Sequence, residues 1–294
     1  MSERYELIRR EEGNYPVASM CELVGVSKSG YYNWLGRPEA ATKARRRKLA
    51  LLVESEFKAS DMTYGYRRIT AALKRKGTVV SPDTVRSIMR EKGLKAAQPR
   101  RKVRTTIPAD DIDTRPDLVD RDFTAEAPGL KWVGDITYIR TWVGFVYLAT
   151  VLDCCTKKVV GYAMADNMKT DLICKAIDMA VRRCPHQEEV TIFHSDRGSQ
   201  YTSQQFAKHL KNYKILPSVG RTGVCWDNAW AESFNATLKN ERVHRMVYPT
   251  REKAIKDVAS WIELTYNHTR LHSALGYRTP NEAEHELNSR KQAA

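Results

Sequence analysis

The sequence has little of what zinc-binding, membrane and secreted proteins require. Its 294 residues include only six cysteines and seven histidines, and these form no CxxC pair and no HxxxH partner for one, which argues against a zinc site. The longest apolar stretch, Trp142 to Leu152, is too short for a bilayer, which needs about 20 residues. The N-terminus, MSERYELIRREEG, is charged where a signal peptide requires an apolar segment. We therefore expect a cytoplasmic protein without a membrane partner and with reduced, buried cysteines.

Positive charge is in excess, and nearly all of the excess lies in the first third of the chain. There are 49 Lys+Arg against 35 Asp+Glu, a formal net charge of +14. Residues 1–108 hold 24 Lys+Arg and 11 Asp+Glu, whereas residues 109–294 hold 25 and 24, so the two parts carry +13 and +1. Lys and Arg clusters bind polyanions because they release counterions. The pattern indicates a basic nucleic-acid-binding module joined to a near-neutral one, with a merely solvated basic surface as the alternative.

Residues 1–40 have the pattern of a helix-turn-helix. It predicts a short helix over Val17–Val24, a turn at Gly25 and a second helix over Lys28–Leu35 with Ser27 as its N-cap. In such a motif the second helix faces DNA. The side chains expected on that face are Lys28, Ser29, Tyr31 and Tyr32. An ordinary helical hairpin is the alternative.

Residues 41–104 contain a second and better defined candidate. A basic amphipathic helix begins in ARRRKLALLVESEF, another covers about Tyr66–Lys76, and a third follows Ser81 as N-cap and ends before Gly93. The candidate DNA-binding residues here are Arg67, Arg68, Arg86, Arg90, Arg100 and Arg101. A solvated helix face is the alternative, but two basic hairpins in one +13 segment favour nucleic acid.

Residues 105–128 are acidic and contain prolines, and we interpret them as a linker in which Asp110, Asp111 and Asp113 are solvated. After this linker the pattern changes to strands. The strands expected are Trp132–Arg140, Gly144–Asp153, Lys158–Ala165, Val190–His194 and Lys214–Pro217. The helices expected are Asp171–Arg183, 203–212, 227–243 and Arg251–Tyr266. Three antiparallel strands followed by alternating helix and strand predict an α/β domain with a mixed five-stranded sheet flanked by helices, over 129–245, followed by a C-terminal helix and tail over 246–294.

Three acidic residues stand out in this second module. Asp135 interrupts the apolar strand WVGDITYI, Asp196 follows the strand VTIFH, and Glu232 lies in the helix DNAWAESFNATLKNE. Singly, the last two have ordinary explanations as a turn residue and a surface charge, but a lone carboxylate in an apolar strand is costly to bury unless it is paired or binds a metal. Carboxylates after neighbouring strands and on a following helix can converge at one end of a sheet.

Three oxygen ligands without a thiolate or imidazole nearby suit Mg²⁺, or Mn²⁺ as a substitute. Two such ions could activate an attacking oxygen and stabilise the leaving oxygen of a phosphodiester. Asn228 and Lys239 share a helical face with Glu232, and are expected along the path of the DNA backbone, with a plain solvated lysine as the alternative for Lys239.

WVGDITYI, HSDRGSQY and DNAWAESFNATLKNE resemble the three blocks of the D,D(35)E transposase/integrase core, because 35 residues separate Asp196 from Glu232 and a Lys follows seven positions after the Glu. The resemblance is closest to transposases of the IS-three family of bacterial insertion sequences, and YPVASMCELVGVSKSGYYNW, TYGYRRI, MREKGL and YNHTRLHSALGYRTP extend it over nearly the whole chain.

This resemblance implies a ribonuclease-H-like fold and a DNA transposase. Asp135, Asp196 and Glu232 would hold two Mg²⁺ ions, water would free a 3′-OH at the element's end, and that 3′-OH would attack a second phosphodiester without a covalent protein–DNA intermediate. The expected partners are the element's terminal inverted repeats, target DNA, at least one further copy of the chain, and the protein or fusion from an upstream reading frame, because the chain looks like a second-frame product. A nucleoid-associated location in a bacterial cytoplasm follows.

Two other functions stay open at this point. A retroviral-type integrase shares the core, but it normally carries a His/Cys zinc module for which this sequence has no spacing. A DNA-binding regulator without chemistry would not need the complete set of Asp135, Asp196 and Glu232.

Overall fold

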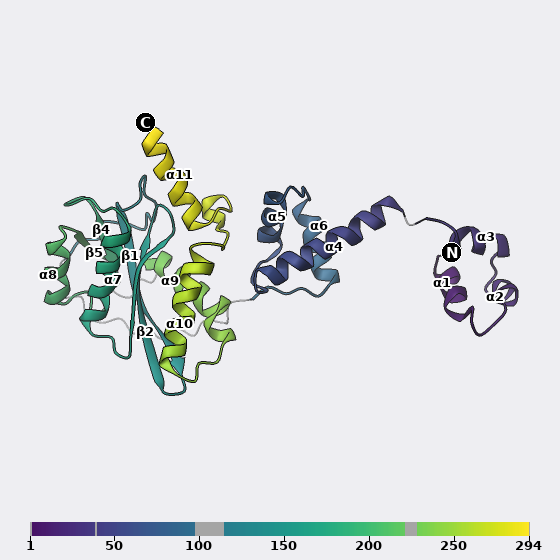
Figure 1. Cartoon of the computed structure of the whole chain (residues 1–294), viewed down its shortest axis with the longest axis horizontal. Helices are drawn as coiled ribbons and strands as arrows, with labels where there is room; N and C mark the ends of the chain where they lie inside the picture. Colours follow the sequence, from purple (N-terminus) through teal and green to yellow (C-terminus); the bar gives the residue numbers. More distant parts are fainter. Residues whose placement is uncertain (1, 39, 98–114, 221–227, 294) are drawn as a thin grey trace. The chain divides into compact units, whose positions relative to one another are not determined.

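The first compact unit is a small helical assembly. The computed structural model describes residues 2–38, 40–97, 115–220 and 228–293, and its contacts divide the chain into Met1–Glu54 and Ser55–Ala294. The first unit holds α1 (Ser2–Glu11), α2 (Val17–Leu23), α3 (Lys28–Leu35) and the first part of α4 (Ala41–Ala59) (Figure 1). The predicted pair α2 and α3 is confirmed, and the Ser27 hydroxyl accepts a hydrogen bond from the Gly30 amide at 3.0 Å as its N-cap.

The sequence prediction for this unit was wrong in two respects. It missed α1, and it placed Tyr31 on the surface facing DNA, whereas Tyr31 is fully buried against Ile8, Met20 and Cys21. The reason is that α1 covers the face of α3 that carries Tyr31, so that the Tyr31 ring lies 6.1 Å from the ring of Tyr5.

The second unit begins with the end of α4 and the helical pair α5 (Tyr66–Arg75) and α6 (Pro82–Glu91). The two helices pack through apolar faces whose buried members are Ile69, Leu73, Val85, Ile88 and Met89. Ser81 caps α6 by accepting a hydrogen bond from the Thr84 amide at 3.2 Å, and Gly93 takes the left-handed conformation just past its end. Both terminal signals were predicted.

A mixed five-stranded sheet forms the centre of the second unit. Its strands, in chain order, are β1 (Lys131–Thr141), β2 (Gly144–Asp153), β3 (Val159–Ala165), β4 (Ile192–Ser195) and β5 (Leu216–Val219). They lie in the order β3-β2-β1-β4-β5, with β1, β2 and β3 antiparallel and with β4 parallel to both β1 and β5. The predicted ribonuclease-H-like α/β architecture is confirmed.

Helices cover both faces of the sheet because its strands alternate apolar side chains to either side. One face packs on α7 (Thr170–Arg183) and α8 (Gln204–Asn212), and the other on α9 (Ala229–Glu241), α10 (Arg251–Ser260) and the π-helix Trp261–Tyr266 (Figure 1). Trp132 belongs to the first of these cores, and its neighbour Val133 to the second. The two cores fix β1 from both sides.

The helix expected over Arg251–Tyr266 is present, and its last part, Trp261–Tyr266, is a π-helix. Two other local predictions for this unit were wrong. A final helix, α11 (Pro280–Ala293), was missed. The end of the supposed linker is packed on the core, because the Leu118 amide donates to Ser218 and Val119 is buried. Asp110, Asp111 and Asp113 lie outside the described residues.

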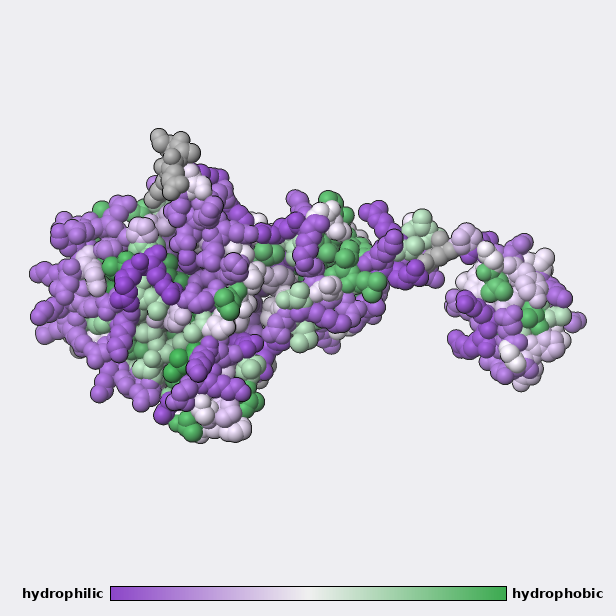
Figure 2. All heavy atoms as spheres, in the orientation of Figure 1, coloured by the Kyte–Doolittle hydropathy of each residue, from purple (hydrophilic) through white to green (hydrophobic). Residues whose placement is uncertain are grey.

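The surface is mainly polar. On the face drawn in Figure 2, hydrophilic residues predominate and hydrophobic ones gather in small patches. Among the helices in the described ranges, none combines the length and apolar character that a membrane span needs. The five cysteines in these ranges are free, and all but Cys155 are buried.

Candidate active site and nucleic-acid interface

Asp135 is held in the middle of β1 by two donors. Its Oδ1 accepts a hydrogen bond from the Ile136 amide at 2.8 Å, and its Oδ2 accepts one from the Asn235 side-chain amide at 2.7 Å. Burial, and then the charge of Asp196, raise the pKa of Asp135 to about 7, and Glu232 adds a smaller increase. The buried carboxylate of Asp135 therefore lies close to two other acidic side chains, whose charges add to the cost of ionising it.

Asp196 follows the end of β4, the strand that lies next to β1. The last residues of β1 and β4 that pair in parallel register are Val133 and His194, and Asp135 and Asp196 each follow two residues later, with Asp196 just beyond the end of β4. The Oδ1 of Asp196 accepts a hydrogen bond from the Gly198 amide at 3.0 Å. Asp196 is exposed, but the protein around it still removes enough water to raise its pKa, against the lowering effects of this hydrogen bond and of His194.

Glu232 approaches from α9, which packs on β1. It lies in the first turn of that helix, is half-buried, and is close enough to raise the pKa of Asp135. Within the ranges that the structure describes, no three His, Cys, Asp or Glu side chains converge closely enough to hold a metal ion. Asp135 nevertheless interacts electrostatically with both Asp196 and Glu232.

The prediction that Asn228 contacts DNA was wrong. Asn228 is buried, with 6% of its surface exposed, and its side-chain amide donates to the Gly134 carbonyl at 3.1 Å. Because Gly134 precedes Asp135, this bond ties the start of α9 to β1 directly beside the candidate site. The residue supports the site and has no exposed face for a DNA backbone.

Two residues of the site were not predicted from the sequence. Asn235 holds Asp135, and its spacing of three from Glu232 on one helix was the signal that could have revealed it. Tyr201 is buried, and its hydroxyl has no hydrogen-bond partner in the described residues. Burial, and then the charges of Asp135 and Asp196, raise the pKa of Tyr201 well above its ordinary value. No sequence pattern distinguishes Tyr201 from a core tyrosine.

Lys239 lies on the same side of the sheet as Asp135. Its Nζ is 4.7 Å from the centroid of the Tyr138 ring, a cation–π contact. Burial lowers the pKa of Lys239, and the negative charge of Asp135 opposes that shift. A half-buried lysine beside the carboxylates is suitably placed for a phosphate that approaches them.

Five of the eight predicted DNA-binding residues in the first third of the chain are exposed. Lys28 and Ser29 are exposed on α3, and Arg90 is exposed on α6. Arg67 and Arg86 are exposed as well, and they flank one aromatic ring, with their guanidinium carbons 5.6 and 5.7 Å from the centroid of Tyr66. This pair gives α5 and α6 a joint basic surface. Arg100 and Arg101 lie outside the described residues.

Arg68 differs from its neighbours. Its guanidinium points to Glu241, with 3.3 Å between the two groups, and only 25% of its side chain is exposed. A DNA phosphate would have to compete with that carboxylate. The geometry does not support the prediction that Arg68 binds DNA.

Comparisons with known proteins agree with this arrangement. Residues 125–225 and 213–280 match family models described as integrase core domain, and residues 44–102 match an HTH-like domain. The chain is 34% identical over 283 residues to the transposase InsF for insertion sequence IS3A of Escherichia coli K12, covering 96% of this chain and 98% of the relative. It is 36% identical over 261 residues to a 31 kDa protein of insertion element IS600 from Shigella sonnei, covering 89% and 96%.

Solved structures are more distant. A chain of a simian T-cell lymphotropic virus intasome is similar with a TM-score of 0.47 and 16% identity, covering 74% of this chain and 70% of that one. The catalytic core domain of HTLV-2 integrase, solved in complex with magnesium, gives a TM-score of 0.42 and 17% identity, covering 54% and 99%.

Proposed function

Because the chain belongs to the family of transposases of IS3 insertion sequences, which carry an integrase core domain, we propose that it cuts and rejoins DNA at Asp135, Asp196 and Glu232. The observation that supports the proposal is the parallel pairing of β1 with β4, which ends two residues before Asp135 and Asp196, together with the hydrogen bond to Asp135 from Asn235, which lies on the helix that carries Glu232. The proposed reaction is hydrolysis at the element's end to free a 3′-OH, followed by attack of that 3′-OH on a second phosphodiester with release of the bridging oxygen as a new 3′-OH.

The three carboxylates fit a divalent cation. Their donors are all oxygens, which suit Mg²⁺ or Mn²⁺. The raised pKa of Asp135, to about 7, arises from burial and from Asp196 and Glu232, and therefore marks a cluster of negative charge that a cation would relieve. We propose that Asp135, Asp196 and Glu232 hold two Mg²⁺ ions. When bound, the metal supplies activation of the attacking oxygen and stabilisation of the leaving oxygen.

The chain's own residues position the reacting groups. Asn235 fixes one oxygen of Asp135 and leaves the carboxylate oriented. Lys239 brings a positive charge to the same side of the sheet, where we propose that it holds a backbone phosphate.

The test of this function is cleavage of labelled DNA that carries the terminal repeats flanking the gene. We expect a nick at the element's end, then strand transfer, both dependent on Mg²⁺ and abolished by EDTA. Binding without cleavage, even with the upstream-frame protein added, would instead support a DNA-binding regulator.

We expect metal binding to depend on pH through Asp135. The metal needs the ionised carboxylate, and the pKa of Asp135 in the free protein is raised to about 7. Apparent affinity should therefore fall about tenfold per pH unit below pH 7, with release of about one proton on binding, and level off above it. Calorimetry with Mn²⁺ at pH 6, 7 and 8, in two buffers of different ionisation heat, measures both quantities. If the affinity for Mn²⁺ stayed the same from pH 6 to pH 8, that result would contradict the role of Asp135 as a ligand.

Arg67 and Arg86 should carry part of the affinity for DNA. We expect Arg86→Ala and Arg67→Ala each to weaken binding to element ends several-fold at about 0.1 M salt, and to reduce the slope of log K against log salt by about 0.9. Lys208→Ala, an exposed lysine on α8, is the matched control and should leave both unchanged. Unchanged affinity in both arginine variants at all salt concentrations would reject the α5–α6 surface.

The remaining assignments follow from this function. We propose that residues 1–40 and 41–104 bind the terminal inverted repeats, that 129–245 carries the chemistry, and that at least two copies join two DNA ends. We also propose that the protein works at the nucleoid of a bacterial cytoplasm, with the upstream-frame protein or fusion as a further partner.

A further inference from the structure

Two segments of the sequence have no role in the chemistry above, yet the second unit brings them together. One is TYGYRRI (Thr63–Ile69), and the other is YNHTRLHSALGYRTP (Tyr266–Pro280). The buried Tyr64 hydroxyl accepts a hydrogen bond from the Leu271 amide at 2.8 Å and lies 3.2 Å from the Thr269 carbonyl, to which it donates. One hydroxyl group thus satisfies a donor and an acceptor of the other segment.

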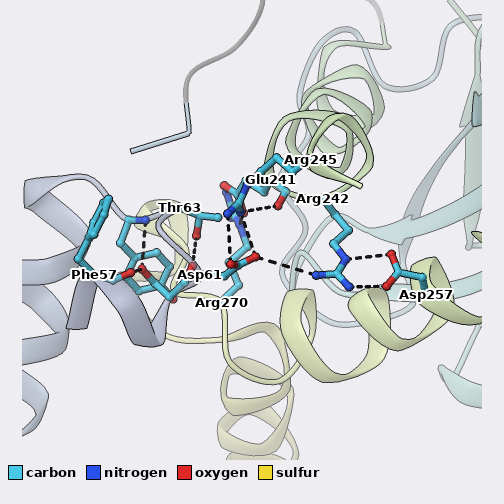
Figure 3. Close-up of polar contacts among 10 residues, drawn as sticks. Phe57, Asp61, Thr63, Glu241, Arg242, Arg245, Asp257 and Arg270 are labelled. Carbon is cyan, nitrogen blue, oxygen red and sulfur yellow. Dashed lines mark hydrogen bonds and ion pairs between the residues drawn. The ribbon is translucent and has the colours of Figure 1, made fainter. Parts of the chain in front are cut away.

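A buried carboxylate joins the same two segments to α9. The carboxylate of Glu241, the last residue of α9, accepts hydrogen bonds from Nε and Nη2 of Arg270, both at 2.7 Å, and from Nη1 of Arg68 at 3.3 Å. Glu241 and Arg270 are 8% and 6% exposed, and Figure 3 shows them pointing toward one another. A two-point arginine–carboxylate pair has a fixed geometry, so these side chains hold the segments in one orientation.

Exposed ion pairs surround this buried group. Asp61, just after α4, pairs with Arg245 at 3.0 Å (Figure 3), and Arg75 of α5 pairs with Glu282 of α11. Asp61 takes a φ of 52°, an uncommon conformation for a residue other than glycine. An uncommon backbone conformation of this kind persists only where the surrounding contacts hold it in place.

Arg68 is the second cation on a carboxylate that Arg270 already satisfies. Burial, and then the charge of Arg270, lower the pKa of Arg68 despite the opposing effect of Glu241. The catalytic core therefore does not need Arg68 for its own charge balance. What Arg68 adds is an attachment of α5.

The attachment lies on the helix that carries the third catalytic carboxylate. Glu232 and Glu241 are nine residues apart on α9, which corresponds to about 14 Å along the helix axis. The pair α5–α6 carries the basic surface of Arg67 and Arg86. A rigid connection between that surface and α9 would fix how far the bound DNA sequence lies from the reacting phosphodiester.

We propose that Tyr64 and Arg68, seated on Glu241 and Arg270, are positioning residues that fix the α5–α6 pair on the catalytic core and so set which phosphodiester is cut. This inference rests on the proposed function. It gives two neighbouring arginines of α5 different roles: Arg68 attaches the helix to the catalytic core, and Arg67 contacts DNA.

The test is the double variant Tyr64→Phe/Arg68→Met in the full-length protein, with nicks mapped to single nucleotides on labelled element-end DNA. We expect cuts to spread to neighbouring phosphodiesters and the share of the correct nick to fall at least fivefold, while affinity for the DNA changes less than twofold. Glu241 keeps Arg270 in this variant, so the core stays folded.

Two controls separate this role from others. Arg67→Ala should weaken binding and keep the nick in place, and Lys208→Ala, an exposed lysine on α8, should change neither. An unchanged nick position in the double variant would overturn the proposal. So would a loss of affinity as large as that of Arg67→Ala, because Arg68 would then be a DNA contact.

A measurement without DNA distinguishes failure of this proposal from failure of the proposed function. In hydrogen exchange of the free protein, the Leu271 amide should exchange at least tenfold faster in the double variant, whereas amides of β1 and β2 should not change. Equal protection of Leu271 would overturn the attachment even if the wild type cuts DNA. If the wild type cuts nothing and Leu271 still loses protection, the proposed function fails and the attachment stands.

Discussion

Asp135→Asn is expected to abolish DNA cleavage and strand transfer, with a loss of about 10³-fold or more. A metal ligand at the reacting phosphate contributes several kcal/mol to transition-state stabilisation, and about 4 kcal/mol corresponds to about 10³-fold in rate. The substitution keeps the shape of the side chain. Its amide can still accept from Ile136, and Asn235, whose Oδ1 is buried without a partner in the described residues, can turn that oxygen toward the new NH₂ group. The measurement is the nicking assay on labelled element ends.

The same variant should be no less stable than the wild type, which separates lost chemistry from lost folding. The folded-state pKa of Asp135 is raised to about 7, so its contribution to stability is greatest at low pH and is lost as the pH rises through 7. Removing the charge should therefore keep or raise the thermal midpoint of the metal-free protein at pH 8. Asp166→Asn, an exposed carboxylate of the same core, should retain activity within about twofold. Residual cleavage by Asp135→Asn near the wild-type rate would exclude Asp135 from the active site.

Glu241→Gln is expected to destabilise the second unit by about 3–5 kcal/mol, the usual cost of leaving a buried ion pair broken. Without this carboxylate, Arg270 and Arg68 would face one another uncompensated, with side-chain exposures of only 7% and 25%. Burial, and then the positive charges of Arg270 and Arg68, lower the pKa of the adjacent His272 to about 3, so His272 stays neutral and adds no further positive charge. Urea unfolding followed by tryptophan fluorescence measures the loss.

Glu282→Gln is the matched control, because its partner Arg75 is exposed on the same helix as Arg68. Exposed ion pairs contribute about 0–1 kcal/mol, so this variant should unfold within about 1 kcal/mol of the wild type. If Glu241→Gln were equally mild, the buried network would not stabilise the unit.

The candidate active site was predictable because its signal is local and chemical. Asp135 is a charged residue in an otherwise apolar strand, and Asp196 follows the next strand that pairs with it. Burying a carboxylate in such a place costs free energy unless it is paired or binds a metal. The 35-residue spacing to Glu232 adds a pattern that helix propensity alone would not produce. The strand β2 was predicted with its observed bounds, because a run of apolar, β-branched and aromatic residues that begins at a glycine defines it.

The wrong predictions share one physical cause, which is that a side chain's partner can come from a distant part of the chain. Tyr31 has the polarity of a surface residue, but α1 covers it. Asn228 has a DNA-binding side chain, but Gly134, 94 residues earlier, accepts its hydrogen bond. Arg68 and Arg67 are adjacent and chemically identical, yet a carboxylate 173 residues away binds only Arg68.

The sequence by itself determined the basic first third, the mixed sheet and the three carboxylates, because composition, alternation and helix capping act between residues close together in the chain. Only the tertiary structure decided which polar groups remain available for DNA or metal. That choice depends on burial and on the partners that folding brings near. Asn235 fixes Asp135 because α9 packs on the sheet, and Glu241 binds Arg68 but not Arg67 because only Arg68 reaches the end of α9. Residues that are close together in the chain do not encode either contact.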